Sequence, residues 1–240
     1  RCMGTEMTKY PLAERFKSPQ GEGLYAGTEM AFVRTVGCSV GHDICRACDT
    51  DFDKVYPHLD GGIYGADEIV TWAAPCEHLC VTGGEPFDRD LRDLVVGANE
   101  TDMLMHVETS GTRHPDWLDP QQQPRQPGQH AVQLVGKDSL FWTWRRLWIT
   151  VSPKPGYLAS MVERVADEIK VIDGGLGDGP GWPTRDDAVR WADMGKLVYL
   201  QPRNHRLSVD RDALDETMTF IGQHPQLRLS VQLHKFLERR

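Results

Sequence analysis

The sequence predicts an α/β fold built on a mostly parallel sheet that is open or partly closed into a barrel. Short apolar segments typical of strands alternate with segments of helical periodicity, and each expected strand ends in a polar or glycine-rich turn. In parallel α/β sheets, functional side chains gather at the carboxyl ends of the strands. The chain has 240 residues, enough to bury a substantial core, so we expect residues 1–240 to form a single domain.

The expected strands are short runs rich in aliphatic residues, and most stop at glycine or proline. The run 78–82 ends in Gly83-Gly84, the run 103–109 ends before Ser110-Gly111, and the run 147–152 ends in Pro153. The full set of expected strands is 29–37, 78–82, 103–109, 147–152, 168–172, 196–202 and 227–232.

The expected helices carry apolar residues on one face, as Leu214, Met218 and Ile221 do in the last of them. Residues 1–18 are assigned as an N-terminal lead-in. A stretch rich in proline and glutamine, 115–128, lies within an expected exposed insertion over 113–146. The expected helices are 67–73, 88–97, 188–194 and 210–223.

Composition excludes several classes of function. The net charge of −8 argues against a nucleic-acid backbone as the main partner. The sequence has no apolar run of membrane-spanning length and no secretory signal, so we expect a cytoplasmic protein without a membrane partner. Reduced thiols are the rule in that compartment, so metal or cluster ligation is the leading interpretation of a tight cysteine group.

Three of the six cysteines, Cys38, Cys45 and Cys48, follow the first expected strand within one short loop. Thiolates suit zinc or an iron–sulfur cluster, and the cysteines alone leave both open, with His42 as a possible fourth zinc ligand. Structural zinc sites usually use two paired knuckles, whereas only Cys45-x-x-Cys48 is a knuckle here. Three cysteines without an obvious fourth fit a four-iron cluster with one iron open for chemistry.

A second motif, Thr82-Gly83-Gly84-Glu85-Pro86, directly follows an expected strand. The two glycines let backbone amides approach a ligand closely. Glu85 can accept hydrogen bonds from an ammonium group or stabilise the turn. Together, the cysteine loop and this turn resemble the radical S-adenosylmethionine superfamily.

Further motifs narrow the resemblance to the 7-carboxy-7-deazaguanine synthase family. They extend from residue 19 almost to the C-terminus, and each is short, but their joint specificity is high. They are Gln20-Gly21-Glu22-Gly23, Ala26-Gly27, Phe32 to Cys38, Cys48-Asp49-Thr50, the Gly-Gly-Glu turn, Val107 to Thr112, Val151 to Pro155, Leu200-Gln201-Pro202 and Leu229 to Lys235.

The resemblance implies an incomplete (β/α)6-type radical S-adenosylmethionine barrel, in a modified and compact form. It implies a lyase that converts 6-carboxy-5,6,7,8-tetrahydropterin to 7-carboxy-7-deazaguanine and releases ammonia, as in queuosine-type or modified-DNA biosynthesis. The implied cofactors are a [4Fe-4S] cluster, S-adenosyl-L-methionine and Mg²⁺. The implied partners are the small pterin, a flavodoxin-like electron donor and a second copy in a homodimer.

The same resemblance implies the site residues. Arg34 would meet the substrate carboxylate, for which a guanidinium is well suited. The cluster ligands would be Cys38, Cys45 and Cys48, and Thr50 would offer its hydroxyl to Mg²⁺. The S-adenosylmethionine site would comprise Ala47, Asp49, Gly84, Glu85, Ser152, Pro153, Lys154, Leu200, Gln201, Pro202 and Arg203. The substrate site would comprise Pro19, Gln20, Gly21, Glu22, Arg34, Thr82 and, through the terminal carboxylate, Arg240.

Several assignments have simpler alternatives. Thr50 could be a helix N-cap, and Arg34 could form an ion pair with Asp49 or Glu22. The family commonly has three residues between its first two cysteines, whereas six separate Cys38 from Cys45, which places His42 at the usual second position. We assign Cys45 as the ligand because the Cys45-x-x-Cys48-Asp49-Thr50 unit is intact. Two other functions stay open, an activase of a glycyl-radical enzyme and a zinc-stabilised binding module.

Overall fold

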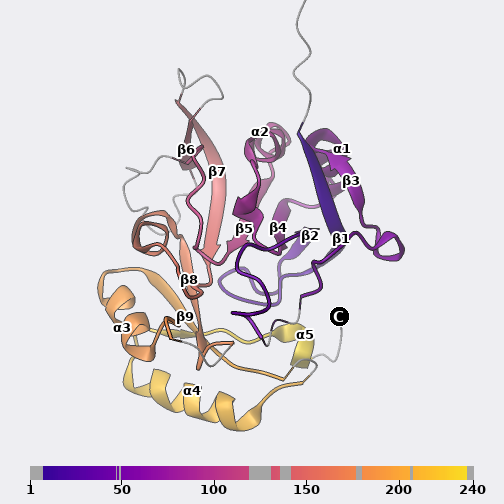
Figure 1. The fold of residues 1–240 in the computed structure, drawn as a ribbon. Coiled ribbons are helices and arrows are strands. Elements are labelled where there is room, and N and C mark those ends of the chain that lie inside the picture. The colour runs from indigo at the N-terminus through magenta and orange to yellow at the C-terminus, as the bar shows by residue number, and fades with distance from the viewer. Residues whose placement is uncertain are drawn as a thin grey trace, which may run out of the picture.

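The computed structural model shows a curved mixed sheet with helices along its outer side (Figure 1). It describes residues 8–46, 48, 50–118, 131–135, 142–176, 180–205 and 208–236, with the backbone alone at 131–135 and 142–145. The strands are β1 (Lys9–Pro19), β2 (Glu29–Thr35), β3 (Gly62–Gly65), β4 (His78–Gly83), β5 (Leu104–Thr109), β6 (Ala131–Val135), β7 (Trp142–Val151), β8 (Glu168–Asp173), β9 (Leu197–Pro202) and β10 (Arg228–Leu229).

The order of strands across the sheet is β10-β9-β8-β7-β5-β4-β2-β1-β3, and β6 pairs with β7 outside this path. Strands β2, β4, β5, β7, β8, β9 and β10 pair in parallel, whereas β1, β3 and β6 pair antiparallel to their neighbours. The sheet ends at two different strands, so it is open. This is the expected α/β architecture of an incomplete barrel.

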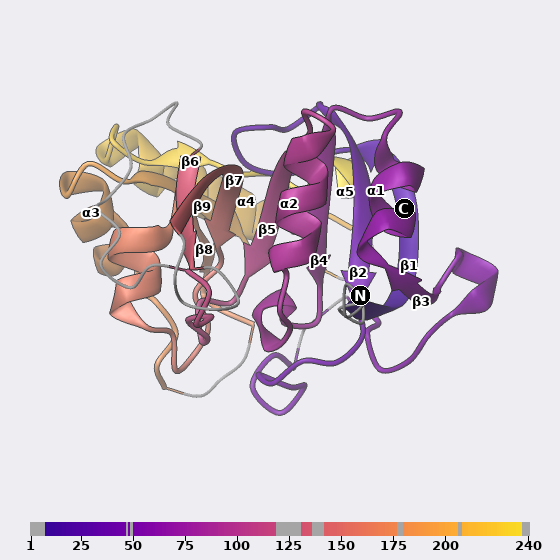
Figure 2. The ribbon, with the colours of Figure 1, turned by 90° about the horizontal axis from the view of Figure 1, so that it is seen from above.

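Helices follow the parallel strands along the outer side of the sheet. Figure 2 shows α1 and α2 together beside β2, β4 and β5, whereas α3 lies beyond β8 and β9. The helices are α1 (Ala66–Ala73), α2 (Arg92–Glu100), α3 (Arg185–Asp193), α4 (Arg211–Gln223) and α5 (Leu233–Phe236), and shorter helical turns occupy Pro57–Leu59, Pro86–Asp88 and Met161–Val165. In the described part of the chain, no helix is long and apolar enough to cross a membrane.

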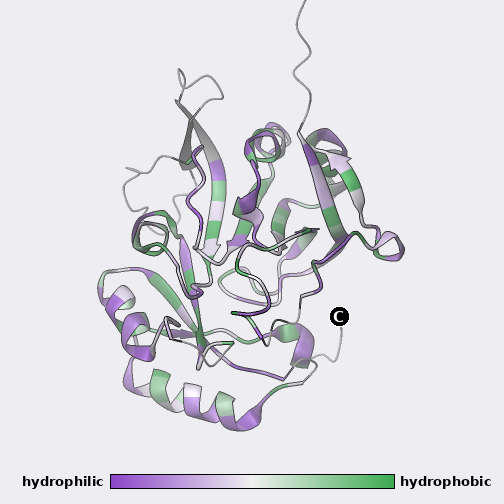
Figure 3. Cartoon of the chain, in the orientation of Figure 1, coloured by the Kyte–Doolittle hydropathy of each residue, from purple (hydrophilic) through white to green (hydrophobic). Residues whose placement is uncertain are grey.

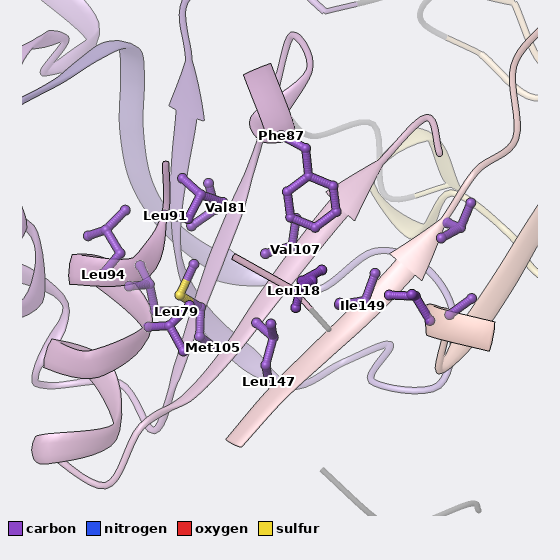
Figure 4. Close-up of a cluster of buried hydrophobic side chains, with 14 of the residues drawn as sticks. Leu79, Val81, Phe87, Leu91, Leu94, Met105, Val107, Leu118, Leu147 and Ile149 are labelled. Atoms are coloured by element: carbon purple, nitrogen blue, oxygen red, sulfur yellow. The ribbon is translucent and has the colours of Figure 1, made fainter. Parts of the chain in front are cut away.

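Successive side chains in the central strands serve two different environments, because strand residues alternate between faces. In β5, Met105 and Val107 join the apolar core under the helices, whereas His106 and Glu108 line a cavity on the other face. Figure 3 shows the same change of hydropathy from residue to residue. Figure 4 shows the apolar side, where Leu79, Val81, Met105, Val107, Leu147 and Ile149 meet residues of α2 and its preceding turn.

The assigned N-terminal lead-in contains a strand that the sequence analysis did not anticipate. Residues 9–19 form β1, which pairs with β2 on one side and β3 on the other. Its Tyr10 and Leu12 have no exposed surface and belong to the main core. Charged residues and Pro11 between the apolar positions obscured this strand, because proline and charge are depleted in strands. Residues 1–7 lie outside the described residues.

Smaller differences concern where elements begin and end. The helix expected over 88–97 begins at Arg92, because Pro86–Asp88 form a separate helical turn capped by the Glu85 carboxylate. The last expected strand, 227–232, pairs only over Arg228–Leu229. Within the expected exposed insertion, β6 pairs with the first half of β7. Trp117 and Leu118 are each 1% exposed and belong to the main core, so this insertion is not exposed throughout. Residues 119–128 of its proline- and glutamine-rich stretch lie outside the described residues.

We predict that Leu12→Ala lowers the free energy of unfolding by about 2–5 kcal/mol, because it leaves a cavity in the core. Ile63→Ala in the adjacent strand β3 is the matched control, since Ile63 is 67% exposed, and it should change stability by less than about 0.5 kcal/mol. Urea unfolding of both variants measures the difference. Equal effects would show that β1 is not part of the core.

Candidate functional site

The structure brings the expected site segments together at the carboxyl edge of the sheet. Arg34 lies opposite Thr82 in the β2–β4 register, and Thr109 lies opposite Val151 in the β5–β7 register. The cysteine loop, the Gly-Gly-Glu turn and the Ser152–Lys154 turn therefore start from neighbouring strand ends. This agrees with the rule that parallel sheets bind ligands at this edge.

The cysteine loop leaves β2 at Gly37, whose φ of 88° suits glycine and whose N–H donates to the Phe52 carbonyl at 2.9 Å. Backbone bonds from Cys45 to Gly41 and from Cys48 to Cys45 fold the loop back on itself. Cys45 is buried, and Cys38 and Cys48 are partly exposed. The two partly exposed thiols border solvent, as a centre reached by an external reductant requires.

The three thiols influence one another electrostatically. Burial raises the pKa of Cys45 to about 11, the Lys154 ammonium opposes that rise, and Cys48 and Cys38 add to it. Burial likewise raises the pKa of Cys38. Because ligation needs thiolates, binding of a metal centre here must displace protons.

The three thiols come from one loop, and both zinc and an iron–sulfur cluster use such ligands. One zinc ion holds thiolates at about 2.3 Å, hence with sulfurs about 4 Å from one another. Within the described ranges, no three or more His, Cys, Asp or Glu side chains converge in a way that would hold one metal ion. Iron–sulfur clusters are held by cysteine thiolates spread around several irons, so three thiolates from one loop are chemically suitable ligands for such a cluster.

The contacts of the His42 side chain argue against its being a metal ligand. Its ring stacks on Phe52 with centroids 4.7 Å apart, and its Nε2 lies 3.4 Å from Asp53 Oδ1. The His42 side chain is 51% exposed, whereas Cys45 is only 7% exposed. The long spacing after Cys38 thus forms a surface turn, and the geometry favours Cys45 as the ligand.

The Gly-Gly-Glu turn packs backbone to backbone against the start of the cysteine loop. Gly84 N–H donates to the Thr35 carbonyl at 3.2 Å, and Glu85 N–H donates to the Gly37 carbonyl at 3.1 Å. A Cβ on Gly84 would lie 1.6 Å from the Gly37 carbonyl oxygen. Glycine is therefore required at position 84 by the fold itself, apart from any ligand.

Glu85 is 1% exposed, and its carboxylate is saturated with donors from its own fold. Oε1 accepts from Phe87 N–H at 3.0 Å and from the Thr109 hydroxyl at 2.6 Å. Oε2 accepts from Ser110 N–H at 2.9 Å and from the Ser110 hydroxyl. Of the two roles the sequence allowed, the structure shows the turn-stabilising one, which ties β4 to the end of β5.

The Ser152–Lys154 turn places a half-buried ammonium group beside the thiols. Lys154 Nζ donates to the Ser152 carbonyl at 2.8 Å and to its hydroxyl at 3.0 Å. Burial lowers the pKa of Lys154, and the negative charges of Cys45 and Cys48 oppose that shift. A cation held there can balance the negative charge of an iron–sulfur centre or of a carboxylate.

The other expected cofactor residues differ in position. Gln201 is buried and faces Glu22, Pro202 is buried, and Arg203 is exposed. Leu200 belongs to the apolar core on the opposite face, so only its backbone can face a ligand. Ala47, Asp49 and Arg240 lie outside the described residues.

Two of the expected substrate residues, Gln20 and Glu22, line a small cavity on the concave face, and Thr82 bonds to Glu108 of the same lining. Gln20 Nε2 donates to Glu108 Oε1 at 3.0 Å, and the Thr82 hydroxyl donates to Glu108 Oε2 at 3.3 Å. Arg34 pairs with Glu14 at 2.8 Å and donates to the Thr50 hydroxyl at 3.3 Å. Of the two partners considered from sequence, Glu22 pairs with Lys170, and Asp49 lies outside the described residues. The cavity is lined by Gln20, Glu22, Tyr25, His106, Glu108, Trp148, Thr150, Glu168 and Lys170.

Glu22 forms a buried ion pair with Lys170 of β8. Burial alone would raise the pKa of Glu22, but the Lys170 ammonium more than offsets this and lowers it. Burial alone would lower the pKa of Lys170, but Glu22 and Glu108 raise it. Gln232 and Gln201 also donate to Glu22, at 2.8 and 3.4 Å. The pair therefore stays charged in the folded protein.

The chain between β1 and β2 is held down at several further points. Leu24 N–H donates to Glu168 Oε2 at 2.9 Å, and Leu233 N–H of α5 donates to the Gly21 carbonyl at 3.0 Å. The loop of residues 20–28 therefore lies inside the curve of the sheet, as Figure 1 shows. Pro19 ends β1 at the entry to this loop and is exposed.

Sequence reasoning missed Glu108, Glu168 and Lys170, although each has a signal in its strand. Glu168 and Lys170 alternate with the apolar Ile169 and Val171, as His106 and Glu108 alternate with Val107. Charged residues inside otherwise apolar strands are rarely buried unless they are paired or functional. This alternation of charged and apolar residues predicts that the charged side chains lie together on one face of the sheet.

Comparisons with known proteins agree on one family of relatives, although no protein-family model matches the sequence. The chain is 30% identical over 239 residues to the 7-carboxy-7-deazaguanine synthase of Synechocystis sp., covering 95% of this chain and 92% of the relative. It is 28% identical to the enzyme of the same name from Escherichia coli K12, covering 95% and 98%. The fold resembles a crystal structure of QueE from Escherichia coli, with a TM-score of 0.64, 24% identity and coverage of 93% and 94%.

We predict that Gly84→Ala lowers the iron bound after anaerobic reconstitution, because the new Cβ displaces the Gly37 backbone and with it the cysteine loop. Gly222→Ala in α4 is the matched control, since a Cβ there would meet nothing within 4 Å. Iron and sulfide analysis per chain measures the difference. Full iron content in Gly84→Ala would contradict the coupling between the turn and the loop.

We predict that Cys45→Ala abolishes the cluster, whereas His42→Ala retains it, because Cys45 is buried and His42 stacks on Phe52. Iron content and the visible absorption of reconstituted protein distinguish the two variants. A Cys45→Ala protein with a full cluster, lost on adding His42→Ala, would identify His42 as the ligand.

Proposed function

This chain belongs to the 7-carboxy-7-deazaguanine synthase family, and we propose that it converts 6-carboxy-5,6,7,8-tetrahydropterin to 7-carboxy-7-deazaguanine with release of ammonia. The family consists of radical S-adenosylmethionine lyases, which act on a small molecule and use a [4Fe-4S] cluster with S-adenosylmethionine. The observation that carries the proposal is the joining of two sites. The cysteine loop follows the carboxyl end of β2, and the charged cavity lies on the inner face of the same sheet, lined by residues of β5, β7 and β8.

Cys38, Cys45 and Cys48 would hold the cluster, and residues of the adjoining turns would hold S-adenosylmethionine. When bound, the cluster and S-adenosylmethionine supply the radical chemistry that takes a hydrogen atom from the pterin. Gly84 would present its backbone, and Lys154 and Ser152 would flank the cofactor next to the thiols. The proposed set also retains Ala47, Asp49, Glu85, Pro153, Leu200 through its backbone, Gln201, Pro202 and Arg203.

The pterin would bind against the polar inner face of the sheet that this small cavity borders. The purine-like edge of the pterin carries hydrogen-bond donors and acceptors. The Gln20 amide and the Glu22 and Glu108 carboxylates offer matching acceptors and donors. Thr82 would contact the substrate at the rim, beside Glu108. Arg34 would bind the substrate carboxylate, because Glu14 fixes its Nε and leaves the outer guanidinium nitrogens directed toward Thr50.

We also assign a magnesium ligand and a role for the chain end. The Thr50 hydroxyl would contribute an oxygen to Mg²⁺, which keeps most of its waters. Its bond from Arg34 supports a location beside the substrate carboxylate, which can complete the coordination. The C-terminal segment that includes Arg240 would reach the substrate, since α5 already docks on Gly21. Pro19 and Gly21 would edge the pocket through their backbone.

A flavodoxin-like electron donor and a homodimer complete the proposal. The cysteine loop supports an external donor, because Ile44 next to Cys45 is 36% exposed and Cys38 and Cys48 border solvent. Electrons could therefore enter without a channel through the core. Family membership supports the homodimer.

We predict that the anaerobically reconstituted protein forms 7-carboxy-7-deazaguanine and ammonia in equal amounts, without net consumption of S-adenosylmethionine. The Cys45→Ala protein should form neither, and assays with and without Mg²⁺ test the magnesium assignment. Liquid chromatography of the product and an ammonia assay provide the measurements. Absence of turnover in a protein with a confirmed four-iron cluster would refute the proposed reaction.

A further inference from the structure

The floor of the substrate cavity contains a carboxyl group that no assignment above uses. Glu168 begins β8 and lines the cavity together with Glu22, Glu108 and Lys170. It is 3% exposed, so water does not solvate its charge. A buried carboxyl group at this position, within reach of the cavity, needs either a partner or a function.

The charges around Glu168 do not balance. Three carboxyl groups, of Glu22, Glu108 and Glu168, line the cavity against one ammonium group, of Lys170. Lys170 forms its ion pair with Glu22, and Glu108 accepts from Gln20 and Thr82. Like charges held close together in a dry site favour protonation of one of them. Glu168 is the carboxyl group that takes the proton, because Lys170 already forms its ion pair with Glu22.

Electrostatics supports this placement of the proton. Burial is the main cause that raises the pKa of Glu168 to about 7, and the charges of Glu108 and Glu22 raise it further. The hydrogen bond from Leu24 N–H and the charge of Lys170 oppose this rise. The groups that face Glu168 are Lys170 on its own strand, His106 and Glu108 of β5, Glu22 and Tyr25 of the loop, and Tyr199 of β9. Near neutral pH, the carboxyl group thus carries a proton that it can lose.

The loop above fixes the direction of this carboxyl group. Leu24 N–H donates to Glu168 Oε2 at 2.9 Å. A Cβ added to Gly23 would lie only 2.0 Å from Glu168 Oε1, so the loop backbone approaches this carboxyl group closely. Gly23 has a φ of 69°, so glycine suits both its backbone and this close approach. The Glu168 carboxyl group is therefore held in position by the loop that also carries Gln20 and Glu22, so it needs no reorientation when substrate binds.

The proposed reaction needs such a donor, because an amino group leaves carbon readily only as ammonia. We propose that Glu168 donates the proton with which the ring nitrogen expelled in the ring contraction leaves as ammonia, and this inference rests on the proposed function. In the ring contraction of the proposed reaction, a carbon–carbon bond forms and one of the two ring bonds of this nitrogen breaks, which leaves the nitrogen as an amino group on a single carbon. The remaining carbon–nitrogen bond then breaks, its electron pair stays on nitrogen, and nitrogen takes the Glu168 proton to leave as ammonia. The carbon skeleton loses one proton as the new ring becomes aromatic, and that proton restores the carboxyl group.

The test compares wild-type protein with Glu168→Gln, which keeps an acceptor for Leu24 N–H but carries no ionisable proton. We expect kcat to fall by about 100-fold, in the range typical of a lost general acid, with little change in KM. In wild-type protein, kcat should fall as pH rises through about 7, and Glu168→Gln should lose that dependence. Glu168→Asp should restore a titrating limb at a lower rate. Glu100→Gln, on the exposed end of α2, is the matched control.

A second measurement is independent of turnover. Carbon-13 NMR of glutamate side-chain carboxyl groups, in protein without the cluster, should show one resonance that titrates near 7 and is absent from Glu168→Gln. An active wild-type protein whose Glu168→Gln variant keeps its kcat and pH profile would overturn the inference. A Glu168→Gln protein that loses activity through a raised KM alone would also overturn it. Absence of wild-type turnover would instead overturn the proposed reaction.

Discussion

The ion pair between Glu22 and Lys170 is the constraint on which the rest of the site depends. Removing two charges from water is costly, and only close pairing with further hydrogen bonds offsets that cost. Here Gln201 and Gln232 supply those bonds. The pair joins the loop between β1 and β2 to β8, on the far side of the sheet. An open sheet thereby obtains a closed interior, although no backbone ladder completes the barrel.

The same strands build both the core and the site, through their two-residue alternation. Met105 and Val107 stabilise the packing of the helices, while His106 and Glu108 of the same strand face the cavity. A shift of one residue in register would bury the charges under the helices and expose the apolar side chains to the cavity. Selection for a stable core therefore also fixes the register of the polar residues. This explains how a compact chain places so many charges inside its sheet.

Sequence reasoning located the parallel strands and the turns at their carboxyl ends, because apolar runs followed by glycine or proline are a local signal. It missed β1, since Pro11 and the charged residues around it conceal an alternation in which Leu12 is fully buried. It also left the role of Glu85 open, because donors from Thr109 and Ser110 come from a different strand. The pairing of Arg34 with Glu14 was not predicted for the same reason, since Glu14 belongs to the strand that was missed. The assignments at Ala47, Asp49 and Arg240 stay predictions.

The docking of the C-terminal segment has a consequence for how the protein is made. Gln232 contacts Glu22 across 210 positions of sequence, and Leu233 binds the Gly21 carbonyl. Contacts of such long range form late, because the entropy of closing the intervening chain must be overcome first. During synthesis on the ribosome, the cysteine loop emerges long before these residues do. The loop can therefore receive its metal centre while the pocket beside it is still open, and the arrival of α5 completes the pocket afterwards.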